Sequence, residues 1–140
     1  MRDRMALVRD LAERVCAPFD DTYWMERDLS GEFPHDFHQA VAASGLLGVA
    51  MPEEVGGAGL DTLTWLLYEK ELGRANYALH WTCVARPSNI LLAGTEAQKE
   101  KYLYPCIRGE TWDCLAMTEP GAGSDLRGMQ ASARQEGSDW

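Results

Sequence analysis

The stretch Met117-Thr118-Glu119-Pro120-Gly121-Ala122-Gly123-Ser124-Asp125 separates two parts of the chain that differ in sequence pattern. The residues that lead into it, Thr111 to Thr118, suit an extended strand better than a helix. Two glycines flank one small residue, so several backbone N–H groups can converge and an anionic or planar ligand can come close. The stretch is therefore a candidate ligand site where helical patterns give way to a sheet.

A period-two pattern continues after this loop. Residues 129–134 alternate between apolar and polar side chains, which predicts a strand, and Trp140 would begin a returning strand after a turn. Strands at the edge of a sheet must be paired or covered. We therefore expect residues 111–140 to be the beginning of a β domain that is truncated in this sequence, and the chain to be a fragment.

Residues 1–110 show helical patterns instead. Apolar residues recur at helical spacing over Arg4 to Val15, and Thr62 to Leu72 is apolar on most sides, so we expect this second segment to be central and well buried. Pro18 ends the first helix, and Pro34 and Gly45 mark the two ends of a second helix. Asp61 can cap the helix that starts at Thr62, and Gly73 can end it. Pro87 predicts a break near Arg86 within Tyr77 to Ala93, and the Thr95–Gln98 capping box opens a helix that ends near Tyr104, before Pro105. The predicted fold is a multi-helical N-terminal domain, residues 1–110, followed by the first strands of a β domain.

Three connecting features have a more local interpretation. Leu46 to Pro52 has no polar side chain and is expected to be a buried extended connection. The glycine-rich loop Gly56 to Gly59 lacks the Lys-Ser/Thr ending of a P-loop, and a tight turn and a ligand contact are equally supported. Arg86, which stands in an otherwise uncharged segment, either reaches solvent or lines a pocket.

The composition is typical of one globular domain and excludes several classes of protein. The chain has 140 residues, 46% of them hydrophobic, and a formal net charge of −9. This acidic balance disfavours nucleic-acid binding. The longest uncharged run, Val41 to Met51, is shorter than the roughly 20 residues that span a bilayer. The first residues carry mixed charges and lead into a helical pattern, so we expect a cytoplasmic protein without a membrane span.

The cysteines and histidines give no support for a metal site. Cys16, Cys83, Cys106 and Cys114 contain no C-x-x-C spacing, so we expect reduced, buried thiols. His35 and His38 are three residues apart on one predicted helix but have no third ligand nearby. We therefore expect surface or first-turn histidines.

Ordered segments along most of the chain carry a family resemblance. They are Gly31–Pro34, Gly45–Gly48, Pro52–Asp61, Gly94–Lys99, Tyr102–Leu103, Gly109–Glu110 and the opening stretch Met117–Asp125. In order and approximate spacing, the sequence resembles the acyl-CoA dehydrogenases. The resemblance implies an N-terminal helical domain before a central β domain and a second helical domain. It also implies FAD as the cofactor, an acyl-CoA as the substrate, and fatty acid metabolism as the setting.

The resemblance further implies roles for individual residues. Leu115, Met117 and Thr118 would lie beside the isoalloxazine ring, although Leu115 departs from the aromatic residue often found there. The implied substrate contacts are Gly121, Gly123, Ser124, Trp81, Thr82 and Ala85. Glu119 is expected to tie the loop by hydrogen bonds. The family's catalytic glutamate, which removes the α-proton while the β-hydride passes to flavin N5, would lie outside this sequence.

Several alternatives remain open at this point. The resemblance implies a dehydrogenase that forms a trans-2-enoyl-CoA, passes electrons to an electron-transfer flavoprotein or a similar acceptor, and forms a dimer or tetramer. Acyl-CoA oxidases and flavin monooxygenase-like relatives share the fold and use oxygen. A non-catalytic binding or assembly module is the third alternative, because half of a cofactor site exposes apolar surface that favours association. We expect the isolated 140 residues to hold no FAD and to be inactive.

Overall fold

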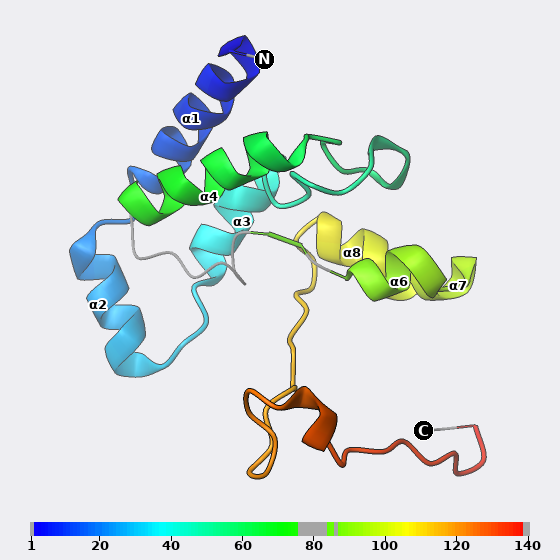
Figure 1. Ribbon diagram of the computed structural model, residues 1–140. Coiled ribbons are helices and arrows are strands. Elements are labelled where there is room, and N and C mark those ends of the chain that lie inside the picture. Colours follow the sequence, from blue (N-terminus) through cyan, green and yellow to red (C-terminus); the bar gives the residue numbers. More distant parts are fainter. Residues whose placement is uncertain (1, 76–83, 86, 139–140) are drawn as a thin grey trace.

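A computed structural model describes residues 2–75, 84–85 and 87–138. In these residues the regular secondary structure is helical (Figure 1). In chain order the elements are α1 (Arg2–Cys16), α2 (Asp21–Ser30), α3 (His35–Ala43), the short 3₁₀ helix η1 (Glu53–Val55), α4 (Thr62–Ala75), α6 (Ser88–Ala93), α7 (Glu96–Gln98), the π-helix η2 (Lys99–Leu103), α8 (Tyr104–Ile107) and the 3₁₀ helix η3 (Leu126–Gly128).

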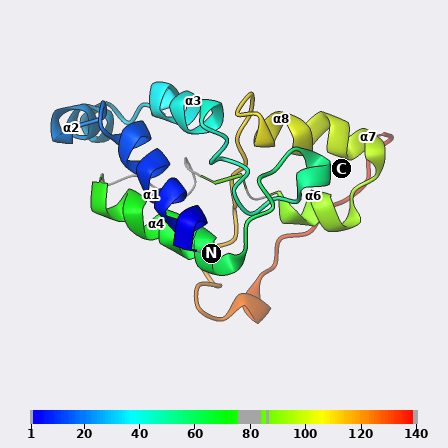
Figure 2. The same cartoon turned by 90° about the horizontal axis from the view of Figure 1, so that it is seen from above.

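The helices up to α8 form one body around a common core. Helix α1 packs along α4, and α3 lies against α1, as both views show (Figures 1 and 2). The largest side chains at the centre, Phe37 and Tyr68, are completely buried. The same interface buries the carboxylate of Glu71 on α4, which accepts hydrogen bonds of 3.1 Å from Arg9 of α1 and from Arg74. This ion-paired carboxylate ties α1 to α4.

Several predicted boundaries are confirmed. Helix α1 covers the predicted segment, and Asp61 caps α4 by accepting a 2.9 Å hydrogen bond from the Thr64 backbone N–H. The Thr95 capping box opens α7, where side chain and backbone bond reciprocally with Gln98. Gly45, with φ of 77°, takes the left-handed conformation just after α3.

Helix α2 was not predicted, although its end signals are in the sequence. The carboxylate of Asp20 accepts a 3.0 Å hydrogen bond from Tyr23 N–H, and Gly31, with φ of 69°, closes the helix in the left-handed conformation. None of its residues is fully buried. A helix without a buried face gives a weak hydrophobic pattern, and this explains why periodicity alone missed it.

Three expectations for the helical part are wrong. Gly73 does not end α4, which continues to Ala75, and α4 is not buried on all sides because Leu63 and Leu66 are exposed. The connection from Leu46 to Pro52 is buried as expected, but it forms consecutive turns rather than an extended segment. Hydrogen bonds three residues apart, such as Met51 N–H to Gly48 O at 3.0 Å, satisfy its buried backbone.

Pro105 does not end the helix that precedes it. The chain passes from α7 through the π-helix η2 into α8, and Pro105 lies in the first turn of α8. The Tyr104 N–H bonds to the Lys99 carbonyl, five residues back, so the turn before the proline is wider than an α-turn. A π-turn leaves room for the proline ring, which an α-helix would exclude.

The glycine-rich loop at 56–59 packs against the protein itself. A Cβ on Gly57 would collide with the Met51 carbonyl oxygen, and the Gly59 N–H donates a 2.8 Å hydrogen bond to that same oxygen. The close approach of these two backbone segments accounts for a glycine at position 57.

Residues 112–138 extend away from the helical body as an arm (Figure 1). The strands predicted over 111–118 and 129–134 are not formed, and the one ladder contact among the described residues is the isolated antiparallel bridge between Glu119 and Ala122. A strand needs a hydrogen-bonded neighbour, and no ladder of backbone hydrogen bonds joins either one to another described segment. The arm therefore has the sequence pattern of β-strands, but no described strand pairs with it.

Candidate functional site

The residues predicted to contact a flavin lie in the first part of the arm. Leu115 is 61% and Met117 38% exposed, and Thr118 is exposed as well. From Leu115 to Thr118, no backbone N–H group bonds to another described backbone group. We call Leu115 to Thr118 the flavin-facing segment. It presents apolar side chains, a hydroxyl and N–H groups that bond to no described backbone group.

The glycine-rich loop that follows is held by Glu119, as the sequence predicts. Its carboxylate accepts two hydrogen bonds of 2.8 Å, from the backbone N–H groups of Gln130 and Ala131. The Glu119 backbone also pairs with Ala122, whose side chain is buried. These bonds fold residues 119–131 into a closed loop that does not depend on the helical body.

The predicted substrate contacts in this loop are accessible. At Gly121 and Gly123, an added Cβ would meet no atom within 4 Å, and Ser124 is exposed. The space beside these glycines is open to a ligand. The structure therefore brings Gly121, Gly123 and Ser124 together on the surface of one loop, a short distance along the chain from Thr118.

The other predicted substrate contacts are not part of this surface. Ala85 lies in the hydrophobic core, where its N–H donates a 2.8 Å hydrogen bond to the Leu47 carbonyl. Trp81 and Thr82 lie outside the described residues, and so does Arg86, for which the sequence left solvent and pocket positions open. The roles predicted for these four residues stay predictions.

A cleft of about 830 Å³ lies beside the start of the arm and reaches Leu115. It is formed by α6, η2, α8 and the exit of the arm, and its lining residues are Pro87, Ser88, Asn89, Ile90, Lys101, Tyr102, Cys106, Thr111, Trp112, Asp113, Cys114 and Leu115. The polar residues Asn89, Lys101 and Tyr102 were not predicted as site residues. The sequence signal for Tyr102 is the family-like segment Tyr102–Leu103, which was not assigned a site role; the π-helix η2 contains Lys101 and Tyr102.

The flavin-facing segment has the chemistry that an isoalloxazine ring requires. The ring has apolar faces and a polar pyrimidine edge, so a protein must offer apolar side chains and hydrogen-bond donors along one strip. Leu115 and Met117 supply the apolar surface, while Thr118 and the N–H groups without a described backbone acceptor supply donors. The residues present therefore fit FAD.

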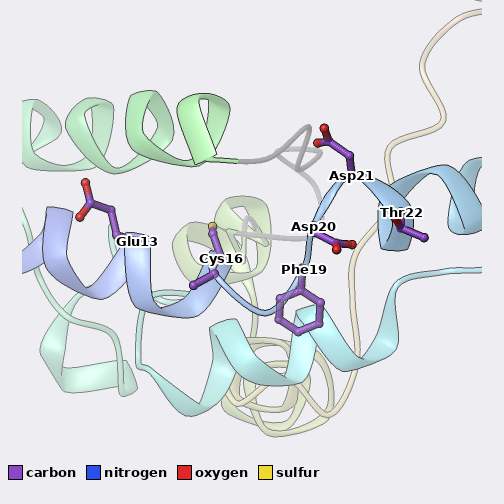
Figure 3. A pocket seen from close by; sticks show the side chains of 7 residues that line it. Glu13, Cys16, Phe19, Asp20, Asp21 and Thr22 are labelled. Carbon is purple, nitrogen blue, oxygen red and sulfur yellow. The ribbon is translucent and has the colours of Figure 1, made fainter.

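A second cavity, of about 510 Å³, lies where α1 turns into α2 (Figure 3). Its lining is acidic through Glu13, Asp20 and Asp21, and Asp20 is already engaged as the cap of α2. Burial raises the pKa of the Cys16 thiol in this cavity to about 11, so the thiol is protonated at neutral pH and is a poor nucleophile. This cavity shows no catalytic arrangement.

The described histidines and cysteines form no metal site. Within residues 2–75, 84–85 and 87–138, no group of three or more His, Cys, Asp or Glu side chains could hold a metal ion. Both histidines lie in the first turn of α3, as expected; His35 is exposed, whereas the His38 ring is buried beside Phe33 and Trp112. Cys16 and Cys106 are buried and form no disulfide, whereas Cys114 is exposed; Cys83 lies outside the described residues.

Comparison with protein families assigns the helical body. The family described as "Acyl-CoA dehydrogenase, N-terminal domain" matches residues 2–110, which is most of the chain. The chain belongs to the acyl-CoA dehydrogenase family. The resemblance seen in the sequence is thereby confirmed, and the helical body corresponds to the N-terminal domain of this family.

One curated relative is the "3-(aryl)acrylate reductase" of Clostridium sporogenes. It is 40% identical over 136 residues, which cover 94% of this chain and 35% of that protein. The chain thus spans about a third of the length of this relative.

Two solved structures share the fold. One is "Electron transferring flavoprotein of Acidaminococcus fermentans: Towards a mechanism of flavin-based electron bifurcation", with a TM-score of 0.81 and 29% identity, covering 98% of this chain and 37% of that one. The other is butyryl-CoA dehydrogenase from Megasphaera elsdenii, with a TM-score of 0.64 and 31% identity, covering 92% of this chain and 34% of that one. In both cases the present chain covers about a third of the length of the solved chain.

Proposed function

We propose that this chain is the N-terminal part of an FAD-dependent acyl-CoA dehydrogenase that oxidises an acyl-CoA to a trans-2-enoyl-CoA. The observation that carries this proposal is the flavin-facing segment, Leu115 to Thr118, which follows a family-type helical body and presents apolar side chains and N–H groups that bond to no described backbone group. Membership of a family of oxidoreductases supports the reaction class.

Each part of the arm has a role in this proposal. Leu115 and Met117 cover the ring face, and Thr118 with the adjacent N–H groups bonds the pyrimidine edge, where negative charge grows on reduction. Gly121, Gly123 and Ser124 contact the substrate, with Ser124 near its pantetheine or phosphate portion. Glu119 holds this loop closed through Gln130 and Ala131.

The redox chemistry belongs to the cofactor. The chemistry that FAD supplies when bound is to accept the hydride from the β-carbon. The residues of this chain position the ring and the thioester. The base that removes the α-proton is a glutamate outside these residues, so the chain contributes binding and orientation. Trp81, Thr82 and Ala85 are proposed to line the acyl pocket in the assembled enzyme.

The partners follow from the same proposal. The substrate is an acyl-CoA, the electron acceptor is an electron-transfer flavoprotein or a similar protein, and the whole enzyme is a homo-oligomer. The similarity to the Acidaminococcus fermentans structure, which is described as an electron transferring flavoprotein, supports the acceptor. No helix in the described ranges is long and apolar enough to cross a membrane. The cytoplasmic location stays a prediction from the sequence, and so does the oligomeric state.

A second candidate function is reduction of a 2-enoyl compound. It is favoured by the relative described as a 3-(aryl)acrylate reductase. This is the reverse of the same reaction, since the double bond takes a hydride at the β-carbon and a proton at the α-carbon. The chain's residues would have the same positioning roles in either direction.

The two functions can be separated with the protein encoded by the whole reading frame. Purified under air, it should be yellow, and anaerobic addition of butyryl-CoA should bleach the flavin absorbance if it is a dehydrogenase. If an aryl acrylate or its CoA thioester reoxidises the chemically reduced protein and butyryl-CoA fails to bleach it, the reductase function holds. A protein that carries flavin but responds to neither compound would contradict both.

A further inference from the structure

The cleft beside the start of the arm is large enough for a small organic ligand. Its volume is about 830 Å³, and ligand pockets in proteins commonly measure roughly 300–1,000 Å³. Its walls come from α6, η2, α8 and residues 111–115, so side chains that are distant in the sequence converge on it. One of them is Leu115, the first residue of the flavin-facing segment. A ligand in the cleft therefore adjoins that segment.

Two aromatic side chains of the cleft wall present much of their surface. Tyr102 of η2 is 48% exposed, and Trp112 at the exit of the arm is 49% exposed. Each ring already contacts another side chain. The Trp112 indole stacks on Phe33, with ring centroids 4.5 Å apart and an interplanar angle of 15°, and the Lys101 ammonium lies 5.0 Å from the centroid of the Tyr102 ring. Such pre-ordered rings lose little conformational freedom when a ligand binds to them.

The other lining side chains favour an uncharged, apolar ligand group. Pro87, Ile90 and Leu115 supply aliphatic surface. Lys101 and Asp113 are the two charged residues among the described lining residues, and their formal charges cancel. A phosphate would find no net positive charge in this lining, whereas an aromatic ring can pack on aliphatic and aromatic side chains alike. The lining therefore suits an aromatic ring.

The proposed reaction needs room beside the flavin-facing segment for one part of the substrate. The β-carbon is the atom that loses or gains the hydride, so the group bonded to it lies next to the reacting carbon. We propose that the cleft binds an aromatic ring attached to the β-carbon of the substrate, and that Tyr102 and Trp112 contact this ring. The inference rests on the proposed function only in assigning the ring to the substrate. Tyr102 then determines specificity for aryl over short alkyl substrates.

Binding of the ring can be tested on the 140-residue chain without any flavin. The probe is the N-acetylcysteamine thioester of 3-phenylpropanoate, which is uncharged and has its ring on the β-carbon. In ¹H–¹⁵N NMR spectra, titration should shift the amides of Asn89, Ile90 and Tyr102 and the indole N–H of Trp112 in a saturable way. The matched probe with a cyclohexyl group in place of phenyl should bind about threefold more weakly or worse, because it makes no aromatic pair.

Variants of Tyr102 assign this binding to the cleft. Tyr102→Ala should weaken binding of the phenyl probe by about twofold to tenfold, the range expected for loss of one aromatic pair. Tyr102→Phe keeps the ring and should bind as the wild type does. So should Leu92→Ala, which truncates an exposed side chain of α6 outside the cleft lining. Circular dichroism checks the fold of each variant, and Tyr102→Leu replaces Tyr102→Ala if the alanine variant is unfolded.

Three results of the titration would overturn the proposal. The first is the absence of saturable shifts at the cleft residues. The second is equal affinity for the phenyl and cyclohexyl probes, which would mean that the cleft does not recognise aromaticity. The third is an unchanged affinity for the phenyl probe when the Tyr102 ring is removed.

The consequence for substrate choice is tested in the protein encoded by the whole reading frame. The ratio of kcat/KM for 3-phenylpropanoyl-CoA to kcat/KM for butyryl-CoA should fall by about twofold to tenfold in Tyr102→Ala, and it should keep its wild-type value in Tyr102→Phe and Leu92→Ala. If neither thioester is turned over, the proposed function fails, and the titration still decides whether the cleft binds a ring. If butyryl-CoA is oxidised and the ratio is unchanged in Tyr102→Ala, the proposed function stands and the role of the cleft in substrate choice is refuted.

Discussion

The helical body and the arm are stabilised in different ways. The body, up to Ile107, contains every residue of the hydrophobic core, including the completely buried Phe37 and Tyr68. Along residues 112–138, Ala122 is the one buried side chain, and the loop there is closed by the Glu119 carboxylate. The comparison shows that the body can fold on its own apolar burial, whereas the arm has local hydrogen bonds but requires partner surfaces to become a sheet.

Truncation of one apolar side chain in each region should separate them most clearly. Phe37→Ala removes a ring that packs edge-on against Phe19 and Trp24, and it should lower the free energy of unfolding by about 3–5 kcal/mol. Leu115→Ala, in the arm, should change it by less than about 0.5 kcal/mol. Urea unfolding followed by circular dichroism measures both. A comparable loss for Leu115→Ala would mean that the arm shares the stabilising core.

The ion-paired carboxylate between α1 and α4 should give the next largest effect. Arg9→Ala leaves the buried Glu71 with Arg74 as its one remaining described ion-pair partner, so we expect a loss of about 1–3 kcal/mol in unfolding free energy. Arg4→Ala, at an exposed position of the same helix, is the matched control. Equal urea midpoints for the two variants would show that the Arg9–Glu71 pair contributes nothing to the body.

Removal of Glu119 should affect the arm and leave the body unchanged. In Glu119→Ala the N–H groups of Gln130 and Ala131 lose their acceptor, and their hydrogen exchange should accelerate by roughly tenfold or more. Glu119→Gln, which keeps one carbonyl acceptor, should give a smaller acceleration. The urea midpoint should stay at the wild-type value in both variants, and a shift in it would contradict the independence of the two regions.

The smallest expected effect is the pH dependence of the α4 cap. Hydrogen bonds from the Thr64 backbone N–H and hydroxyl hold the pKa of the Asp61 carboxyl below its ordinary value. Because the folded-state pKa is lowered, the stabilisation is complete above the ordinary pKa and is lost as the pH falls through the folded-state pKa, below about pH 4. Amide exchange at Thr64 should rise in that range in the wild type and not in Asp61→Asn.

Local signals in the sequence predicted much of the helical body. The Asp61 cap and the Thr95 capping box depend on side chains within three residues of the groups they bond, so the sequence contains everything that they need. The Glu119 tie was also predicted, from its place in a recognised loop. Features that depend on residues close to one another in the chain could therefore be predicted from the sequence alone.

The errors arose where distant residues decide the outcome. Pro105 was expected to end a helix, but the π-turn before it accommodates the ring. Gly73 lies inside α4, since packing of α4 on α1 outweighs the low helix propensity of one glycine. The predicted strands have no hydrogen-bonded partner strand among the described residues. The residues within a strand do not show whether a partner strand is present. The cleft-lining residues Lys101 and Tyr102 were missed for the same reason.

We propose that the arm carries one part of an FAD site and that the helical body carries none of the redox chemistry. The most direct measurement is flavin absorbance after gel filtration, for the 140-residue chain and for the protein encoded by the whole reading frame. The account predicts stoichiometric FAD on the whole protein and none on the 140-residue chain. Stoichiometric flavin on the 140-residue chain, or none on the whole protein, would contradict it.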